Sequence, residues 1–219
     1  SCGLKACNAD AMSDRPSYIL FITDQQRYDH LGCNGHPVLQ TPNIDAMAAQ
    51  GVNYDRFYVA SPVCMPNRAS LMTCRMPSSH GVRSLGVPLT HDNVTFVDLM
   101  RAAGYDTALI GKSHLQTVTD WPVQIEPPVY RDGFSAPPEE LAVAIKSDLA
   151  GGAYQYEKQC CYEKDDPEVP LPFYGFQDYV SVLRHGFNTG GSHELYQKQH
   201  APDVLPLKSR DVQFPHDYI

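Results

Sequence analysis

Apolar and polar positions follow two different periods along the first half of the chain. Residues 18–22 (YILFI) form a short apolar run, which predicts a buried parallel strand whose end delivers Asp24. Residues 52–60 alternate between apolar and polar positions and predict a second strand. Residues 107–111 (TALIG) predict a third strand, which delivers Lys112 at its end.

Three segments between these strands follow the helical period. Residues 41–45 (TPNID) open a helix that Gly51 ends, and residues 95–103 (TFVDLMRAA) predict an amphipathic helix. Residues 68–72 are also helical in pattern, which places Cys64 in the turn before a helix N-terminus. Because strands and helices alternate, we expect an α/β fold with a parallel-rich sheet and helices on both faces.

The pattern weakens beyond about residue 120. Two proline-rich segments, residues 122–138 and 167–172, predict loops. Residues 139–149 (EELAVAIKSDL) predict one short helix. The recognisable motifs therefore lie in the first half of the chain.

Composition and charge exclude several kinds of partner. The net charge is −8 and the 17 Lys and Arg residues are scattered, so we expect no nucleic-acid partner. No segment approaches the roughly 20 apolar residues that cross a bilayer, so we expect no membrane partner. The seven cysteines form no Cys-x-x-Cys pair, and adjacent Cys160 and Cys161 are interpreted as two ordinary thiols. This usage favours a reducing compartment, and we expect a cytoplasmic location.

Side chains with useful chemistry follow each predicted strand. Asp24 and Gln25 follow the first strand, and Cys64 lies in the turn after the second. Lys112 and His114 follow the third strand. Ligands of an open α/β sheet bind beyond the carboxyl ends of its strands, so we expect these side chains to converge. The carboxylate of Asp24 and the amide oxygen of Gln25 suit Ca²⁺, Mg²⁺ or Mn²⁺.

Each candidate also has an ordinary structural interpretation when it is taken alone. On its own, Cys64 is a half-buried thiol, Arg68 is a helix-surface cation and Lys112 is a solvated lysine. His114 alone is a hydrogen-bonded structural histidine. Arg27 is one partner of a surface ion pair, although it lies close enough in sequence to contribute to an anion site. Only the combination of these residues points to a reaction.

The motifs together resemble the type I sulfatase family, whose members depend on formylglycine and belong to the alkaline phosphatase superfamily. Residues 64–68 (CMPNR) resemble the family's Cys-x-Pro-x-Arg sequence, and residues 41–45 resemble its Thr-Pro-Asn-Leu-Asp helix start. Residues 104–107 (GYDT) and 111–114 (GKSH) resemble its second signature, Gly-Tyr-x-Thr followed by Gly-Lys-x-His. The resemblance extends from about residue 13 to about residue 115.

The resemblance implies a nucleophile and a metal site. Cys64 would be oxidised to formylglycine by a formylglycine-generating enzyme, and hydration would give a geminal diol. A divalent cation, Ca²⁺ in the first place with Mn²⁺ and Mg²⁺ as alternatives, would be held by Asp24, Gln25 and the modified Cys64. One hydroxyl of the diol would attack sulfur, and the other would allow the aldehyde to re-form as sulfate leaves.

The resemblance also implies roles for three further residues. Arg68 would hold the diol and balance negative charge. Lys112 would bind a sulfate oxygen and stabilise charge at the reacting centre. His114 would hydrogen-bond the diol and assist the proton transfer that accompanies sulfate release.

The chain departs from the family pattern at four positions. Gln25 stands where the family commonly has a second acidic residue, and glutamine at this place resembles the variant of phosphonate monoester hydrolases and some sulfatases. Cys74 replaces a glycine, and if that position needs a positive φ, its side chain costs about 1 kcal/mol or more. Leu85 stands where close relatives often carry a substrate-facing asparagine, and Ser113 replaces an aromatic residue.

A further expectation concerns the extent of the catalytic domain. The family takes more metal ligands from a later Asp-His or Asp-Asn pair, and none is recognisable here. We therefore expect residues 13–219 to be the N-terminal part of a sulfatase-like catalytic domain that ends before its active site is complete. Residues 1–12 are expected to be a disordered or non-native leader.

Four functions stay open, and hydrolysis of a small-molecule sulfate monoester by an arylsulfatase-like enzyme is preferred. A phosphonate monoester or phosphodiester hydrolase of the same superfamily is favoured by Gln25. Lys112 and His114 argue against it, since those hydrolases carry Tyr and Thr there. An inactive truncated remnant is supported by Cys74, by Leu85 and by the expected lack of a C-terminal half. A cysteine hydrolase would need an activated Cys64 thiolate, which nothing in the sequence specifically predicts.

Overall fold

The chain divides into two compact units, which are described separately. The computed structural model describes residues 15–118, 131–135, 138, 152–163, 167–184 and 190–200. The first unit comprises residues 1–57 and the second comprises residues 58–219. In the described ranges, no helix is both long and apolar enough to cross a membrane. The helix predicted at residues 139–149 lies outside them.

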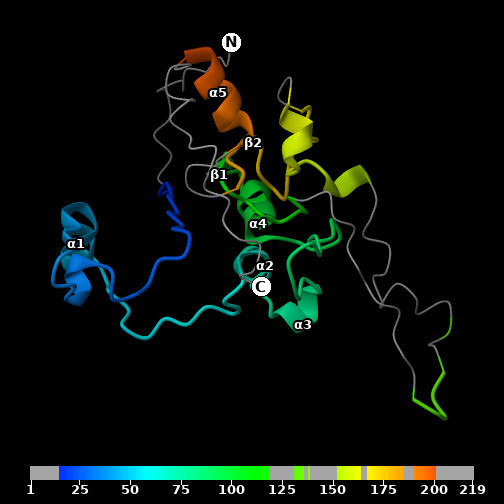
Figure 1. Cartoon of the computed structure of the whole chain (residues 1–219), viewed down its shortest axis with the longest axis horizontal. Coiled ribbons are helices and arrows are strands. Elements are labelled where there is room, and N and C mark those ends of the chain that lie inside the picture. Colours follow the sequence, from blue (N-terminus) through cyan, green and yellow to red (C-terminus); the bar gives the residue numbers. More distant parts are fainter. Residues whose placement is uncertain are drawn as a thin grey trace, which may run out of the picture. The chain divides into compact units, whose positions relative to one another are not determined.

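Short helices and a small parallel sheet make up the described elements (Figure 1). The first unit contains η1 (Gly32–Asn34) and α1 (Pro42–Gln50). The second unit contains α2 (Cys64–Thr73), α3 (Pro77–His80), α4 (Phe96–Ala102), β1 (Ala108–Gly111), η3 (Gly152–Tyr154), η4 (Gln159–Tyr162), β2 (Asp178–Ser181) and α5 (Ser192–His200).

The motif at residues 41–45 joins α1 to η1 within the first unit. The Thr41 hydroxyl donates a hydrogen bond to Asp45 Oδ1 at 2.7 Å, and the Cys33 backbone N–H donates to the same oxygen at 2.7 Å. Pro42 occupies the first turn of α1, where its missing N–H is not needed. The helix ends before Gly51, so both predicted boundaries are confirmed.

The two predicted strands at residues 18–22 and 52–60 are wrong as secondary structure. Across the described residues 15–60 the chain forms no strand, and Phe21 and Phe57 are each 78% exposed. A strand needs a neighbour for its backbone N–H and C=O groups. Apolar composition predicts which residues suit a sheet, but it does not supply that neighbour.

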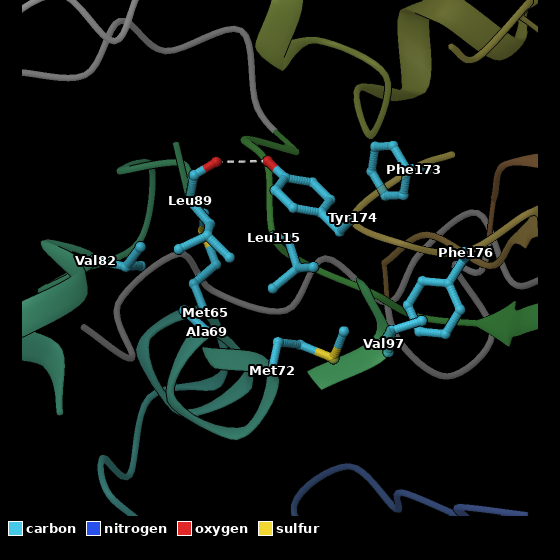
Figure 2. Close-up of a cluster of buried hydrophobic side chains, with 10 residues drawn as sticks. All are labelled: Met65, Ala69, Met72, Val82, Leu89, Val97, Leu115, Phe173, Tyr174 and Phe176. Carbon is cyan, nitrogen blue, oxygen red and sulfur yellow. Dashed lines mark hydrogen bonds between the residues drawn. The ribbon is translucent and has the colours of Figure 1, made fainter. Parts of the chain in front are cut away.

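Helix α2 packs one face against the core of the second unit (Figure 2). Met65, Ala69 and Met72 recur at the helical period and are all buried. They contact a cluster of buried side chains from other parts of this unit: Val82, Leu89, Val97, Leu115, Phe173, Tyr174 and Phe176. The Tyr174 hydroxyl donates to the Leu89 carbonyl at 2.6 Å, so the polar end of this buried ring is satisfied.

The observed start of α2 corrects the prediction for Cys64. Cys64 is the first residue of the helix and Val63 is its extended N-cap, so Cys64 does not lie in a preceding turn. The helix can begin here because Pro66 falls in the first turn, where a backbone N–H has no acceptor within the helix. Pro66 is therefore compatible with a helix that begins at Cys64.

The sheet of the second unit consists of one predicted strand and one unpredicted strand. β1 confirms the strand predicted at residues 107–111, and α4 confirms the helix before it. β2 pairs with β1 in parallel, with Ala108 opposite Asp178 and Gly111 opposite Ser181, and Figure 1 shows them side by side. Parallel pairing together with helices confirms the predicted α/β class.

Candidate active site

Cys64 and Arg68 lie one turn apart on α2. Residues four apart project from the same face of a helix, and this face adjoins the one that Met65 and Ala69 bury. The Cys64 thiol is partly exposed and forms no disulfide. Arg68, in contrast, is only 8% exposed, so its charged side chain is largely shielded from solvent. The core contact of α2 thus fixes the direction in which both side chains point.

Arg68 connects this helix to the second motif. Its Nη1 donates a hydrogen bond to the Lys112 carbonyl oxygen at 2.5 Å. A charged donor makes this bond stronger than one between neutral groups. The contact joins residues 44 positions apart in the chain, so the Cys-x-Pro-x-Arg and Gly-Lys-x-His motifs meet in the folded unit.

The segment that follows β1 is buried and tightly bent. Ser113, His114, Leu115 and Gln116 are all buried, and His114 adopts a left-handed backbone with φ 51°. Leu115 packs in the core, and its carbonyl accepts the Leu89 N–H at 2.8 Å. Left-handed backbone is uncommon for residues other than glycine and is often found at functional sites. The bend thus occurs at a predicted catalytic residue.

Glu157, which no sequence motif predicted, holds this segment. Its Oε1 accepts the Ser113 hydroxyl at 2.6 Å and the His114 N–H at 2.6 Å. Its Oε2 accepts the Leu115 N–H at 2.7 Å and the Gln116 N–H at 2.5 Å. Complete burial raises the pKa of the Glu157 carboxyl, and the four hydrogen bonds oppose that shift.

The Gln116 side chain and Tyr179 strengthen the same contact. Gln116 Oε1 accepts the Tyr156 N–H at 3.0 Å, and Gln116 Nε2 donates to the Ala153 carbonyl at 3.2 Å. The Tyr179 hydroxyl of β2 lies 3.3 Å from the Ser113 hydroxyl. Residues 153–157 therefore run alongside residues 113–116 through both backbone and side-chain bonds.

The predicted metal ligands Asp24 and Gln25 belong to the first unit. Both are exposed, and Gln25 has a left-handed backbone with φ 51°. Their carboxylate and amide oxygens fit a hard divalent cation, which takes roughly six to eight oxygen ligands when it is Ca²⁺. Within the described ranges, no three His, Cys, Asp or Glu side chains are grouped to hold a metal.

Arg27 forms the surface ion pair that the sequence suggested. Its Nη2 lies 2.6 Å from Asp29 Oδ2 and its Nε donates to Asp29 Oδ1 at 2.9 Å. This two-point contact lowers the pKa of the Asp29 carboxyl. Both side chains are largely exposed, so the pair contributes little to stability.

Comparison of the sequence with known proteins identifies the family of this chain. The sequence model of the sulfatase family matches residues 16–135, which contain all the motifs described above. The chain therefore belongs to the sulfatase family.

Individual relatives carry the same family name. An ulvan-active sulfatase of Formosa agariphila is 28% identical over 215 residues, covering 88% of this chain and 40% of the relative. The human steryl-sulfatase is 40% identical over 114 residues, or 47% of this chain and 20% of the relative. An arylsulfatase of Clostridium perfringens is 40% identical over 103 residues, or 46% of this chain and 21% of the relative. The chain thus spans two fifths or less of the length of these relatives.

Proposed function

We propose that the protein to which this chain belongs hydrolyses a sulfate monoester and that its nucleophile is formylglycine made from Cys64. The observation that carries this proposal is the hydrogen bond from Arg68 to the Lys112 carbonyl, which brings the two sulfatase motifs into contact. Membership of the sulfatase family supports it independently. The hydrated aldehyde supplies one hydroxyl that attacks sulfur and a second that lets the aldehyde re-form as sulfate leaves.

Three residues near Cys64 in the proposed site have separate roles in binding and in proton transfer. Arg68, nearly buried and one helical turn from Cys64, balances negative charge beside the nucleophile. Lys112 offers its ammonium group to a sulfate oxygen. His114 moves the proton that accompanies sulfate release. The leaving alcohol takes a proton as its bond to sulfur breaks.

The residues proposed to hold a divalent cation are the three that the resemblance to the sulfatase family implies. Asp24 and Gln25 would each offer an oxygen, and the modified Cys64 would offer a third ligand. The cation, Ca²⁺ in the first place, would supply positive charge that polarises the sulfate oxygens. Gln25 makes the ligand set one charge less negative than a pair of acids, so Mn²⁺ and Mg²⁺ are the alternatives.

The test begins with the protein expressed from its complete coding sequence together with a formylglycine-generating enzyme. Mass spectrometry of the peptide containing Cys64 should show the aldehyde in place of the thiol. The matured protein should hydrolyse an aryl sulfate, and C64A should not. An unmodified thiol and no sulfate hydrolysis would contradict the proposal.

A second candidate, hydrolysis of a phosphonate monoester or phosphodiester, is favoured by Gln25. The discriminating experiment uses one aryl leaving group as sulfate, phosphodiester and phosphonate. We expect the sulfate to give the highest kcat/KM. A higher kcat/KM for the phosphodiester or phosphonate would replace the first proposal with the second.

We also propose that the protein is cytoplasmic and that a formylglycine-generating enzyme acts on Cys64. The cysteine usage supports a reducing compartment, because the seven cysteines have no regular spacing and form no Cys-x-x-Cys pair. Cell fractionation followed by thiol labelling tests this location. Recovery of the protein from an oxidising compartment would contradict it.

A further inference from the structure

We propose that Glu157 is a positioning residue, whose carboxylate fixes the backbone of residues 113–116 and so places Lys112 and His114 for reaction. The inference rests on the proposed sulfate-ester hydrolysis. Glu157 lies outside every motif that defines the site, and its side chain is fully buried. Glu157 binds the Ser113 hydroxyl and the backbone N–H groups of residues 114–116, and it acts on the side chains of Lys112 and His114 through that backbone.

The four hydrogen bonds to Glu157 use the full capacity of its carboxylate. Each oxygen accepts two donors at 2.5–2.7 Å, one pair from Ser113 and His114 and the other from Leu115 and Gln116. A carboxylate offers about four acceptor positions, so no position is left over. Every one of these donors comes from the segment immediately after Lys112.

The left-handed backbone of His114 follows from this arrangement. Successive backbone N–H groups converge on one point when a residue between them is left-handed, and the concavity they form binds an anion. Here the N–H groups of His114, Leu115 and Gln116 converge on the Glu157 carboxylate, and His114 has φ 51°. A charged acceptor therefore stabilises a conformation that a histidine otherwise avoids.

The hydrogen bond to Glu157 explains why a serine stands at position 113 in the second signature of this chain. Its hydroxyl is the fourth donor to Glu157, and it is buried between that carboxylate and the Tyr179 hydroxyl. The departure from the family's aromatic residue is thus matched to a carboxylate that requires a donor at this place. Ser113 and Glu157 form a coupled pair.

Two anchors hold the segment from both ends. Arg68 binds the carbonyl of Lys112, and Glu157 binds the N–H groups that follow. The backbone of Lys112 and His114 therefore cannot shift without breaking hydrogen bonds to charged groups. A displacement of about 1 Å in a reacting group can lower a rate roughly 10²-fold, so such anchoring matters for catalysis.

The test compares E157Q with E163Q in the complete, matured protein. Glu157→Gln keeps the shape but places an amide N–H₂ against backbone N–H donors. Glu163→Gln makes the same chemical change at an exposed residue after η4. Backbone hydrogen exchange at residues 114–116 should accelerate at least about 10-fold in E157Q and stay unchanged in E163Q. Unchanged exchange in E157Q would overturn the proposal.

Kinetics separate positioning from a purely structural role. For each folded molecule, kcat of E157Q for an aryl sulfate should fall roughly 10²-fold with a smaller change in KM. Gly175 has φ +91°, and an added Cβ there would lie 2.6 Å from the Asp98 backbone nitrogen, so G175A should destabilise the same unit. Because Gly175 makes none of the hydrogen bonds to Glu157, G175A should retain the wild-type kcat per folded molecule. An unchanged kcat in E157Q would overturn the positioning role.

The exchange measurement needs no turnover, so it distinguishes the two proposals. A matured wild type without activity toward any ester would overturn the proposed function and its catalytic consequence. Faster exchange in E157Q would still establish that Glu157 fixes the segment.

Discussion

Cys74 occupies a backbone conformation that suits glycine. It ends helix α2 with φ 55° and ψ 30°, the left-handed geometry that commonly terminates helices. A side chain in this conformation costs about 1–2 kcal/mol, because its Cβ approaches the following carbonyl oxygen. The sequence raised this possibility from the family's glycine at the same place, and the positive φ confirms it.

Replacing Cys74 by glycine should therefore stabilise the protein. We expect C74G to raise the free energy of unfolding by about 0.5–1 kcal/mol, after allowing for the greater freedom of glycine in the unfolded chain. Urea denaturation measures the change. C74A, which keeps Cβ and removes the thiol, is the control and should change stability by less. An equal gain in both variants would show that the thiol, and not the backbone, is unfavourable.

The link between η1 and α1 depends on the partly buried carboxylate of Asp45. The Asp45 carboxylate accepts bonds from the Thr41 hydroxyl and the Cys33 N–H, each at 2.7 Å. The side-chain bond from Thr41 is the largest cause that lowers the pKa of Asp45 below its usual value. The link is thus fully formed only while Asp45 is ionised.

The pH dependence of this link has a definite sign. Because the pKa of Asp45 is lower in the folded than in the unfolded chain, its stabilising effect is present above the unfolded pKa. That effect is lost as pH falls through the folded pKa. Carboxyl titration by NMR should show T41V with an Asp45 pKa closer to the ordinary value, and T41S with the wild-type pKa. A wild-type pKa in T41V would contradict the role of the hydroxyl.

The junction between α4 and the segment before β2 requires glycine at position 175. Gly175 has φ +91°, and a Cβ there would lie 2.6 Å from the Asp98 backbone nitrogen. Its carbonyl accepts the Thr107 hydroxyl at 2.8 Å, and the neighbouring Tyr174 carbonyl accepts the Thr95 hydroxyl at 2.9 Å. The chain therefore passes directly against the first turn of α4.

Alanine at this position should be strongly unfavourable. We expect G175A to lower the free energy of unfolding by about 2–5 kcal/mol, from left-handed strain together with overpacking against backbone atoms. Gly86 is the matched control, because it has φ +83° with nothing within 4 Å of an added Cβ. G86A should cost only about 1–2 kcal/mol. Thermal unfolding of both variants decides the matter, and equal losses would contradict the close approach.

Elements with a local cause were predictable from sequence, and those that need distant partners were not. Thr95 and Asp98 form a reciprocal capping box, so the start of α4 is encoded within four residues. β2 comes after a proline-rich segment and is four residues long, and it forms a strand only because β1 supplies a partner. Residues 18–22 and 52–60 were wrongly predicted as strands for the same reason, because no strand within the described residues 15–60 pairs with them.

The candidate catalytic residues were predictable from the sequence where they belong to motifs. Residues 64–68 and 111–114 were expected to meet, and the bond from Arg68 to Lys112 shows that they do. Glu157 was missed because a lone glutamate in weakly patterned sequence carries no signal until the fold buries it. The roles of Asp24 and Gln25 as metal ligands stay predictions, since both lie in the other unit.

The central claim is that Cys64 becomes a formylglycine whose two hydroxyls allow repeated cleavage of a sulfate ester. The most direct measurement is the time course of alcohol release from an aryl sulfate by matured wild type and by C64S. A serine offers one hydroxyl, so the sulfate it accepts has no aldehyde route for release. We predict sustained turnover by the wild type and a single equivalent of alcohol from C64S, with sulfate retained on the introduced serine. Sustained turnover by C64S would contradict the account.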